Sequence, residues 1–259
     1  MKKLAELFDL SGRVALVTGG SRGLGLNIAE ALAEYGAKIF LVARKQHELD
    51  EAAAHLEAAG ATVGTLAADL SYANAPREIV EAVMARFGRI DILVNNAGAS
   101  WGAPAEDYPE EGWDKVLNLN VTALFRLTQI AAKRASLPQG KGSIINIASV
   151  EGLGAHHPDM IGIVGYNTAK GAVVNLTRAL AAEWGPKNIR VNAIAPGYFP
   201  SKLADATVER HGKYLIHMTP LGKLGGPDDL KGLALLLASD ASGHITGQII
   251  VVDGGSSVI

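Results

Sequence analysis

The sequence predicts a single α/β domain in which a parallel sheet of about seven strands is covered by helices on both faces. Short β-branched runs alternate with longer Ala-rich stretches of helical spacing between Arg13 and Val252. The runs are largely apolar on both faces, which is typical of buried parallel strands. Because crossovers between parallel strands are right-handed, the sheet is expected to be doubly wound. The expected strands are Val14–Thr18, Lys38–Val42, Thr62–Leu66, Ile90–Val94, Ser143–Ile147, Arg190–Ile194 and Gln248–Val252.

The stretches between these strands have the apolar spacing of helices. No linker or change of composition divides the chain, so residues 1–259 are expected to form one domain. The segment 197–227 is rich in His, Gly and Pro, and it predicts an irregular lid over a binding site. The expected helices include Leu26–Tyr35, Glu48–Ala59, Arg77–Phe87, Trp113–Arg134 and a helix from Tyr166 to Trp184.

Composition excludes several classes of protein. The chain has 24 Lys and Arg against 26 Asp and Glu, so its net charge of −2 gives no electrostatic reason to expect nucleic acid or an anionic membrane as a partner. Cysteine is absent, which rules out a disulfide scaffold, a Cys nucleophile and a thiolate metal site. Glu6 and Asp9 interrupt any apolar leader, and no apolar run is long enough to cross a membrane. We therefore expect a cytoplasmic location.

A glycine-rich loop follows the first strand and precedes the first long helix. Gly19, Gly23 and Gly25 have the spacing Gly-x3-Gly-x-Gly, which matches the common dinucleotide fingerprint only loosely. Taken alone, the loop is equally a glycine-rich turn. Its position between strand and helix favours a dinucleotide site, because glycine lets the backbone approach a pyrophosphate at the positive end of the helix.

The end of the second strand predicts which nicotinamide cofactor is used. A ribose 2′-hydroxyl usually meets an acidic residue there, whereas a 2′-phosphate meets arginine. Here Ala43 occupies that place and is followed by Arg44, and Arg22 in the glycine loop reaches the same region. NADP(H) is therefore expected over NAD(H), although both arginines are also compatible with a solvated surface.

Three later loops follow expected strands and add to the same crevice. The residues expected to contact the cofactor are Gly19, Ser21, Arg22, Gly23, Leu24, Gly25, Arg44, Asp69, Leu70, Asn96, Ala97, Gly98, Tyr166, Lys170, Pro196, Gly197, Phe199 and Ser201. Each loop alone is also compatible with an ordinary turn, and Asp69 with a helix cap.

Tyr166 and Lys170 lie four residues apart on one face of an expected helix. A neighbouring ammonium lowers the pKa of a phenol from about 10 toward the range useful for proton transfer. Ser149 follows the fifth strand, where its hydroxyl can meet a substrate carbonyl or simply serve a turn. Asn120 lies on the apolar stripe of its helix, so its buried amide must bind a water, a backbone group or a kinked turn.

A metal site is not expected. His156 and His157 are adjacent, so their side chains diverge, and no acidic ligands cluster nearby. The large apolar side chains of the later loops are expected to form substrate-pocket walls or the core of the lid; these are Trp101, Met160, Tyr198 and Phe199.

Together these motifs resemble the short-chain dehydrogenase/reductase family over essentially the whole chain. The resemblance implies that Tyr166 donates the proton in reduction and that Lys170 lowers its pKa and holds the nicotinamide ribose. It also implies that Ser149 steadies the carbonyl, that Asn120 holds a water linking Lys170 to solvent, and that Ser201 contacts the carboxamide. A homotetramer or homodimer, packed partly through the Trp113 and Tyr166 helices, is implied as well.

A narrower likeness concerns the substrate. Leu93–Gly102, Tyr108–Thr122 and Ile194–Lys202 are similar to 3-oxoacyl reductases associated with rhamnolipid synthesis, and Leu7–Gly12 to gluconate 5-dehydrogenase-like members. We therefore expect an NADP(H)-dependent oxidoreductase that acts on a 3-oxoacyl thioester or related carbonyl. Oxidation of a sugar, sugar acid or polyol is the alternative, and a non-catalytic NADP-binding sensor is an alternative of another class. The segment between Ser149 and Tyr166 is longer than usual for the family, and it lies beside the substrate.

Overall fold

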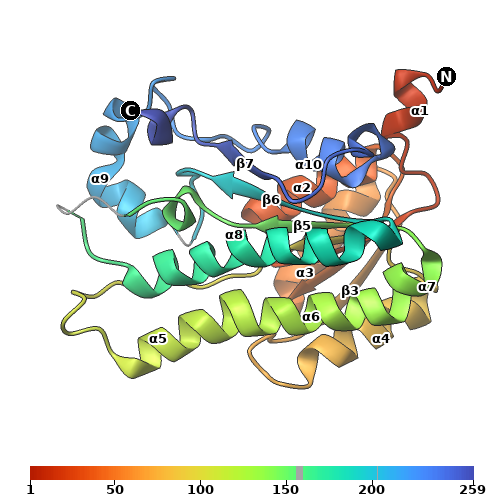
Figure 1. Ribbon diagram of the computed structural model, residues 1–259, viewed down its shortest axis with the longest axis horizontal. Helices are drawn as coiled ribbons and strands as arrows, with labels where there is room; N and C mark the ends of the chain where they lie inside the picture. The colour runs from red at the N-terminus through yellow and green to blue at the C-terminus, as the bar shows by residue number, and fades with distance from the viewer. Residues whose placement is uncertain (156–159, 203) are drawn as a thin grey trace.

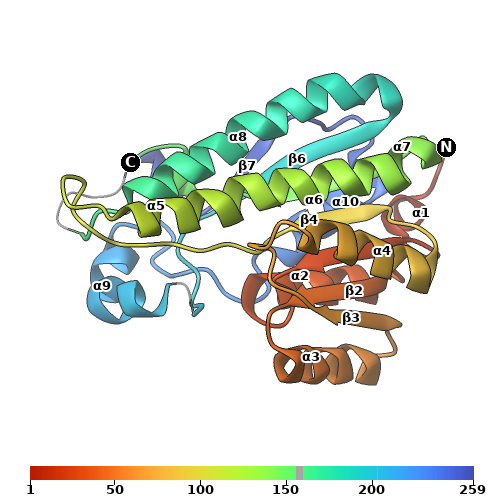
Figure 2. The ribbon, with the colours of Figure 1, turned by 90° about the horizontal axis from the view of Figure 1, so that it is seen from below.

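A parallel sheet forms the centre of the molecule, and helices cover both of its faces (Figures 1 and 2). The computed structural model describes residues 1–155, 160–202 and 204–259. Within these residues the sheet has seven strands in the order β3-β2-β1-β4-β5-β6-β7, all paired in parallel. The strands are β1 (Val14–Thr18), β2 (Lys38–Ala43), β3 (Val63–Ala67), β4 (Ile92–Asn95), β5 (Gly142–Ile147), β6 (Ile189–Pro196) and β7 (Ile249–Val252). The predicted doubly wound fold is confirmed, with strand ends shifted by one or two residues.

The helices divide between the two faces of the sheet. α2, α3 and α10 pack on one face, and α4, α6 and α8 pack on the other. The α-helices are α1 (Leu4–Phe8), α2 (Gly23–Glu34), α3 (Gln46–Ala58), α4 (Ala75–Phe87), α5 (Glu110–Leu117), α6 (Leu124–Ala131), α7 (Leu137–Gln139), α8 (Val164–Trp184), α9 (Asp205–His217) and α10 (Lys231–Ala238). The shorter helical segments are η1 (Asn118–Ala123), η2 (Ala132–Ser136), η3 (Val150–Gly152), η4 (Gly185–Lys187), η5 (Asp240–Ser242) and η6 (Ser256–Val258).

β1 shows why the strands read as continuous apolar runs. Successive side chains of a strand point to opposite faces of the sheet. Ala15 and Val17 therefore join the core under α2, α3 and α10, whereas Val14 and Leu16 join the core under α4, α6 and α8. The residues of β1 are thus buried by a helix layer on each face of the sheet, so the sheet is a rigid base for the loops at its ends.

Two expected elements differ from the structure. The stretch predicted as one helix from Trp113 to Arg134 contains two π-helical segments, η1 and η2. The segment 197–227, predicted as irregular, contains the helix α9, in which Leu215 is buried. The Gly and Pro content of that segment is concentrated at its two ends, which leaves room for a helix between them.

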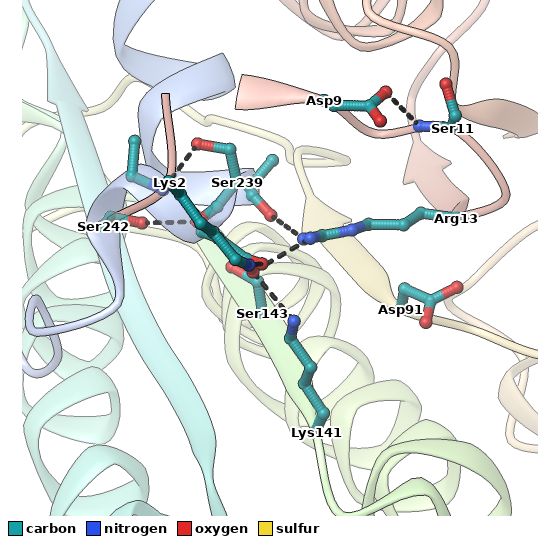
Figure 3. Close-up of polar contacts among 12 residues, drawn as sticks. Lys2, Asp9, Ser11, Arg13, Asp91, Lys141, Ser143, Ser239 and Ser242 are labelled. Atoms are coloured by element: carbon teal, nitrogen blue, oxygen red, sulfur yellow. Dashed lines mark hydrogen bonds and ion pairs between the residues drawn. The ribbon is translucent and has the colours of Figure 1, made fainter. Parts of the chain in front are cut away.

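An ion cluster ties the amino ends of the strands to η5. Asp240 lies 2.9 Å from Arg13, which precedes β1, and 2.8 Å from Lys141, which precedes β5. Lys2 approaches the same carboxylate at 3.4 Å. Figure 3 shows Arg13 and Lys141 reaching this point from different elements of the fold. The cluster fixes the end of the sheet that lies away from the crevice described next.

Candidate active site

The strand order reverses between β1 and β4. In open α/β sheets, ligands bind outside the carboxyl ends of the strands at such a point, and we call this region the crevice. Thr18 ends β1, and its Oγ1 accepts hydrogen bonds from the backbone amides of Asn96 and Ala97, both at 3.0 Å. The Asn96 side chain in turn donates to the carbonyls of Thr18 (3.0 Å) and Gly19 (3.1 Å). The two predicted loops are therefore fastened together. Asn96 was expected at this place, but the positioning role of Thr18 was missed.

The glycine loop has no room for side chains at its base. Gly19 and Gly23 have φ values of +62° and +53°, a region that favours glycine. A Cβ on Gly25 would lie 2.3 Å from the carbonyl oxygen of Gly19 and 2.5 Å from Nδ2 of Asn96. Helix α2 begins at Gly23, so its first amides open beside the loop. Backbone donors in a tight cradle fit the pyrophosphate of a dinucleotide.

Arg22 of the glycine loop forms an ion pair with Glu48 of α3. Its Nη1 lies 3.0 Å from Oε1 of Glu48, and Nζ of Lys45 lies 3.2 Å from the same oxygen. The hydroxyl of Ser21 donates to Oε2 of Glu48 at 3.4 Å. Partial burial acts to raise the pKa of Glu48, but the bond from Lys45 and the charge of Arg22 outweigh it and hold the pKa below its usual value. A 2′-phosphate must therefore compete with a carboxylate for Arg22, whereas Arg44 is exposed at the end of β2.

The other predicted cofactor loops lie at the same edge of the sheet. Oδ1 of Asp69 accepts from the amide (2.9 Å) and the hydroxyl (2.7 Å) of Ser71, so this oxygen holds a turn. Leu70, beside it, is buried in the core. Gly197 follows the last residue of β6, Pro196, where a Cβ would lie 2.7 Å from Cβ of Asp253. Close packing therefore requires glycine at this position.

Phe199 and Ser201 follow β6 but differ in their surroundings. Ser201 faces the glycine loop, since a Cβ on Gly23 would lie 4.0 Å from its Cβ. Phe199 is buried in the core, where its ring leaves no space for a side chain at Gly225. Apolar packing places the side chain of Phe199 in the core, and its contact with the cofactor stays a prediction.

The structure brings Ser149, Tyr166 and Lys170 together. Ser149 follows β5 and caps η3 by accepting a hydrogen bond from the amide of Glu151 at 3.2 Å, and its hydroxyl is also hydrogen-bonded to the phenol of Tyr166. Tyr166 lies in the first turn of α8, and Nζ of Lys170 is 5.5 Å from the centre of its ring. A Cβ on Gly152 would lie 2.5 Å from the backbone of Lys170, so glycine allows η3 to lie directly on α8.

The pKa of Tyr166 moves in the direction opposite to the one expected. Burial raises the pKa of the Tyr166 phenol to about 12, the negative charge of Glu151 adds to that rise, and the hydrogen bond with Ser149 opposes it. Lys170 donates to the carbonyl of Ile147 at 2.7 Å, and burial lowers the pKa of its own amine to about 8. Loss of hydration is therefore the largest cause of both pKa shifts.

Asn120 is fully buried in the π-helical segment η1. Its Nδ2 donates to the carbonyls of Ala99 (2.7 Å) and Val116 (2.9 Å), and its Oδ1 accepts from the amide of Ala99 at 3.3 Å. A Cβ on Gly98 would lie 2.7 Å from Oδ1 of Asn120 and 3.8 Å from Nζ of Lys170. The side-chain amide of Asn120 thus hydrogen-bonds backbone groups of Ala99 and Val116 and lies close to Lys170.

A chain of buried polar side chains that sequence reasoning missed runs beneath the site. Nδ2 of Asn95 donates to Thr128 (2.8 Å) and to Asn146 (2.9 Å), and Asn146 donates to Thr177 (2.9 Å). The chain links β4 and β5 to α6 and α8, the helix that carries Tyr166. Asn95 and Asn146 stand within apolar strand runs, which is the only local signal of their role.

Glu151 and Tyr198 complete the surroundings of Tyr166. The hydroxyl of Tyr198 donates to Oε1 of Glu151 at 3.0 Å. Tyr198 was expected as a pocket wall, whereas Glu151 carries no motif and was missed. Trp101, another expected wall residue, packs on Gly112, and its carbonyl accepts from Tyr108 at 3.1 Å. Met160 is buried.

His156 and His157 lie outside the described residues. Among residues 1–155, 160–202 and 204–259, no group of three or more His, Asp or Glu side chains is arranged to hold a metal ion. In the same part of the chain, no helix has both the length and the apolar character needed to span a bilayer.

Comparison with known proteins agrees with this geometry. Residues 19–257 match the family described as enoyl-(acyl carrier protein) reductase. Over 98% of each chain, the sequence is 41% identical to gluconate 5-dehydrogenase of Gluconobacter oxydans. It is 39% identical to the rhamnolipids biosynthesis 3-oxoacyl-[acyl-carrier-protein] reductase of Pseudomonas aeruginosa, covering 96% of this chain and 97% of that protein.

A solved structure shows the same fold. The crystal structure of a gluconate 5-dehydrogenase from Burkholderia cenocepacia, in complex with NADP and tartrate, has a TM-score of 0.93 and 36% identity, covering 99% of this chain and 100% of that one. Fold, whole-length identity and the arrangement around Tyr166 therefore agree. The chain belongs to the short-chain dehydrogenase/reductase family of oxidoreductases that act on alcohol and ketone groups.

Proposed function

We propose that the protein interconverts a ketone and a secondary alcohol with NADP(H), using Ser149, Tyr166 and Lys170 as its reacting group. The observation that carries this proposal is their convergence at the crevice, with Ser149 hydrogen-bonded to Tyr166 and Lys170 one turn further along α8. The chemistry that bound NADPH supplies is delivery of a hydride to the carbonyl carbon.

Each residue has a distinct task in reduction. The hydroxyls of Ser149 and Tyr166 donate hydrogen bonds to the carbonyl oxygen as it gains negative charge, and Tyr166 then gives up its proton. The phenol of Tyr166 is protonated at neutral pH, as a proton donor requires, since its pKa lies above the usual value. Lys170 holds the nicotinamide ribose, and Asn120 holds a water that connects the amine to solvent.

The cofactor is assigned as NADP(H), bound by the glycine loop and the loops that contain Asp69, Asn96 and Gly197. Support comes from the donors of the tight cradle at Gly19–Gly25 and from the cations around it. β2 ends at Ala43 instead of at an acidic residue, which favours Arg44 and Arg22 as the partners of a 2′-phosphate.

Two substrate classes follow from the relatives. A 3-oxoacyl thioester is the first, supported by the name of the Pseudomonas reductase. A sugar acid or polyol is the second, supported by the name of the Gluconobacter enzyme. A non-catalytic NADP-binding sensor is the contrasting class, and turnover of any ketone excludes it.

We also propose a cytoplasmic homotetramer or homodimer. α5 and α8 lie side by side on one face (Figures 1 and 2), and they carry the exposed apolar side chains of Trp113 and Val164. A hollow of about 560 Å³ between them is lined by these residues and Tyr108. A second copy of the chain would cover this apolar surface.

The first experiment measures NADPH and NADH consumption with a short 3-oxoacyl thioester and, in parallel, with 5-ketogluconate. Tyr166→Phe is expected to lower turnover by about 10²-fold or more while NADPH binding, followed by fluorescence, is kept. Tyr72→Phe makes the same change at a side chain that is 71% exposed and should leave turnover unchanged. Near-normal turnover of Tyr166→Phe would refute the assignment of the proton donor.

A further inference from the structure

A carboxylate stands beside the proposed proton donor. Glu151 belongs to η3, directly after Ser149, and its backbone amide donates to the hydroxyl of Ser149 at 3.2 Å. That hydroxyl is the one bonded to Tyr166. The backbone of Glu151 is therefore one hydrogen bond away from the reacting pair, and its side chain extends from the same short turn.

Side chains from two other segments hold the carboxylate in position. Nδ2 of Asn167, on α8, donates to Oε2 and to the backbone carbonyl of Glu151, both at 2.8 Å. The hydroxyl of Tyr198, in the loop after β6, donates to Oε1 at 3.0 Å. The bonds to Oε1 and Oε2 both use the side chain of Glu151 as an acceptor, as expected for an ionised carboxylate. Three separate parts of the chain thus fix one negative charge.

Glu151, Tyr166 and Tyr198 are each partly exposed, whereas Ser149 and Lys170 are buried. Burial is the largest cause of the raised pKa of Tyr166 and of Tyr198, and the charge of Glu151 adds to the rise at both side chains. A molecule whose carbonyl oxygen meets Ser149 and Tyr166 therefore lies within the field of Glu151.

We propose that Glu151, held by Asn167 and Tyr198, selects ketones that carry a hydrogen-bond donor, a hydroxyl or an ammonium group, close to the reacting carbonyl. This inference rests on the proposed function and adds the class of substrate. A fixed anion stabilises a donor strongly, because charge-assisted hydrogen bonds are the stronger ones. The same anion disfavours a substrate with a carboxylate at that place.

The proposal ranks the two substrate classes. The carbon chain of a 3-oxoacyl thioester offers no donor beside its ketone, so it gains nothing from Glu151. A sugar or polyol ketone carries a hydroxyl on the neighbouring carbon, and that hydroxyl can donate to the carboxylate. A sugar acid is compatible only when its carboxylate points away from Glu151.

The test uses matched ketones that differ in a single group next to the same carbonyl. 2-Butanone has a methyl group there, hydroxyacetone a hydroxyl, dimethylaminoacetone an ammonium and acetoacetate a carboxylate, and methyl acetoacetate is the neutral partner of the last. kcat/KM with NADPH is measured for wild type, Glu151→Gln and Glu151→Ala. Glu57→Gln removes an equal charge from an exposed position on α3 and serves as the control. Ratios between ketones cancel any effect of the variants on the chemical step.

Wild type should favour hydroxyacetone and dimethylaminoacetone over 2-butanone. Glu151→Gln should reduce the preference for the ammonium ketone by about tenfold and raise the acetoacetate to methyl acetoacetate ratio. Glu151→Ala should also remove the preference for the hydroxyl, and Glu57→Gln should change neither ratio. Ratios in Glu151→Gln equal to those of wild type would overturn the proposal, while reduction of the ketones would still support the proposed function.

A binding measurement covers the case in which these ketones turn over too slowly. The melting temperature of the NADP⁺-loaded protein is recorded with 1-dimethylamino-2-propanol and with 2-butanol. A larger rise with the ammonium alcohol, lost in Glu151→Gln, supports the proposal. Equal rises in both proteins refute it. The proposed function is refuted separately, by absence of turnover with the 3-oxoacyl thioester, with 5-ketogluconate and with all of these ketones.

Discussion

Replacement of Gly25 by alanine tests whether the glycine loop is shaped by internal packing. The added Cβ would lie 2.3 Å from the oxygen of Gly19 and 2.5 Å from Nδ2 of Asn96, whereas ordinary contacts begin at 3.4 Å. The overlap of about 1 Å involves backbone on one side, so the loop and the start of α2 must separate. Overpacking of this kind costs about 1–3 kcal/mol of the free energy of unfolding.

The same displacement moves the cofactor cradle. A shift of about 1 Å at a positioning element is enough to lower activity by about 10²-fold. NADPH affinity should fall together with stability, because the displaced amides at the start of α2 are those proposed to bind the pyrophosphate. Urea unfolding at pH 7 and a fluorescence titration with NADPH measure the two effects separately.

Gly232 provides a matched control within another helix. It lies in the first turn of α10, where a Cβ would meet nothing within 4 Å. Gly232→Ala should therefore leave NADPH binding unchanged and alter stability only slightly, by up to about 1 kcal/mol in the stabilising direction. If Gly25→Ala has the stability and NADPH affinity of Gly232→Ala, the packing argument for the loop is wrong.

Two further predictions concern single carboxylates. Glu48→Gln should raise the ratio of NADPH to NADH efficiency several-fold, up to about fivefold, because Arg22 and Lys45 lose a competing anion in an exposed ion pair. Kinetics with both cofactors check this, and an equal change with NADH would contradict it. Asp240→Asn should lower the free energy of unfolding at pH 7 by about 2 kcal/mol, since Arg13, Lys141 and Lys2 lose their shared anion. Burial acts to raise the pKa of Asp240, but its bonds to Lys141 and Arg13 hold that pKa well below 3.8. This stabilisation is therefore present above about pH 4 and is lost as the pH falls, so urea unfolding at pH 7 and pH 3 should show a smaller acid loss in Asp240→Asn than in wild type. Parallel acid losses would contradict the assignment.

Local pattern was sufficient to predict the sheet and the helix that carries Tyr166 and Lys170. β-Branched runs such as Val14–Thr18 are buried on both faces, so their composition alone marks them as strands of a parallel sheet. Residues four positions apart lie on the same face of a regular helix. Tyr166 and Lys170 have this spacing, and both lie on α8. These features depend on residues that are close in the sequence.

Contacts between segments that are distant in the sequence could not be predicted from such local patterns. Glu48 meets Arg22 from a position 26 residues away, and Glu151 meets Tyr198 from 47 residues away. From the sequence alone, a glutamate on a helix or after a strand is interpreted as a solvated side chain, because its distant partner is not known. Phe199 is an example among the aromatic residues. It lies beside a predicted site in the sequence, but its ring is buried in the core against Gly225, which is 26 positions later.

The pKa of Tyr166 shows why spacing predicts proximity better than it predicts chemistry. The four-residue interval placed the phenol and the amine as neighbours, which the geometry bears out at 5.5 Å from ring centre to Nζ. The direction of the shift depends instead on burial, and burial is set by η3, α8 and the loop after β6 together. Loss of hydration penalises the phenolate more than the hydrogen bond with Ser149 stabilises it, and Glu151 adds a further penalty. The same carboxylate that we assign to substrate selection therefore also disfavours the phenolate form of Tyr166.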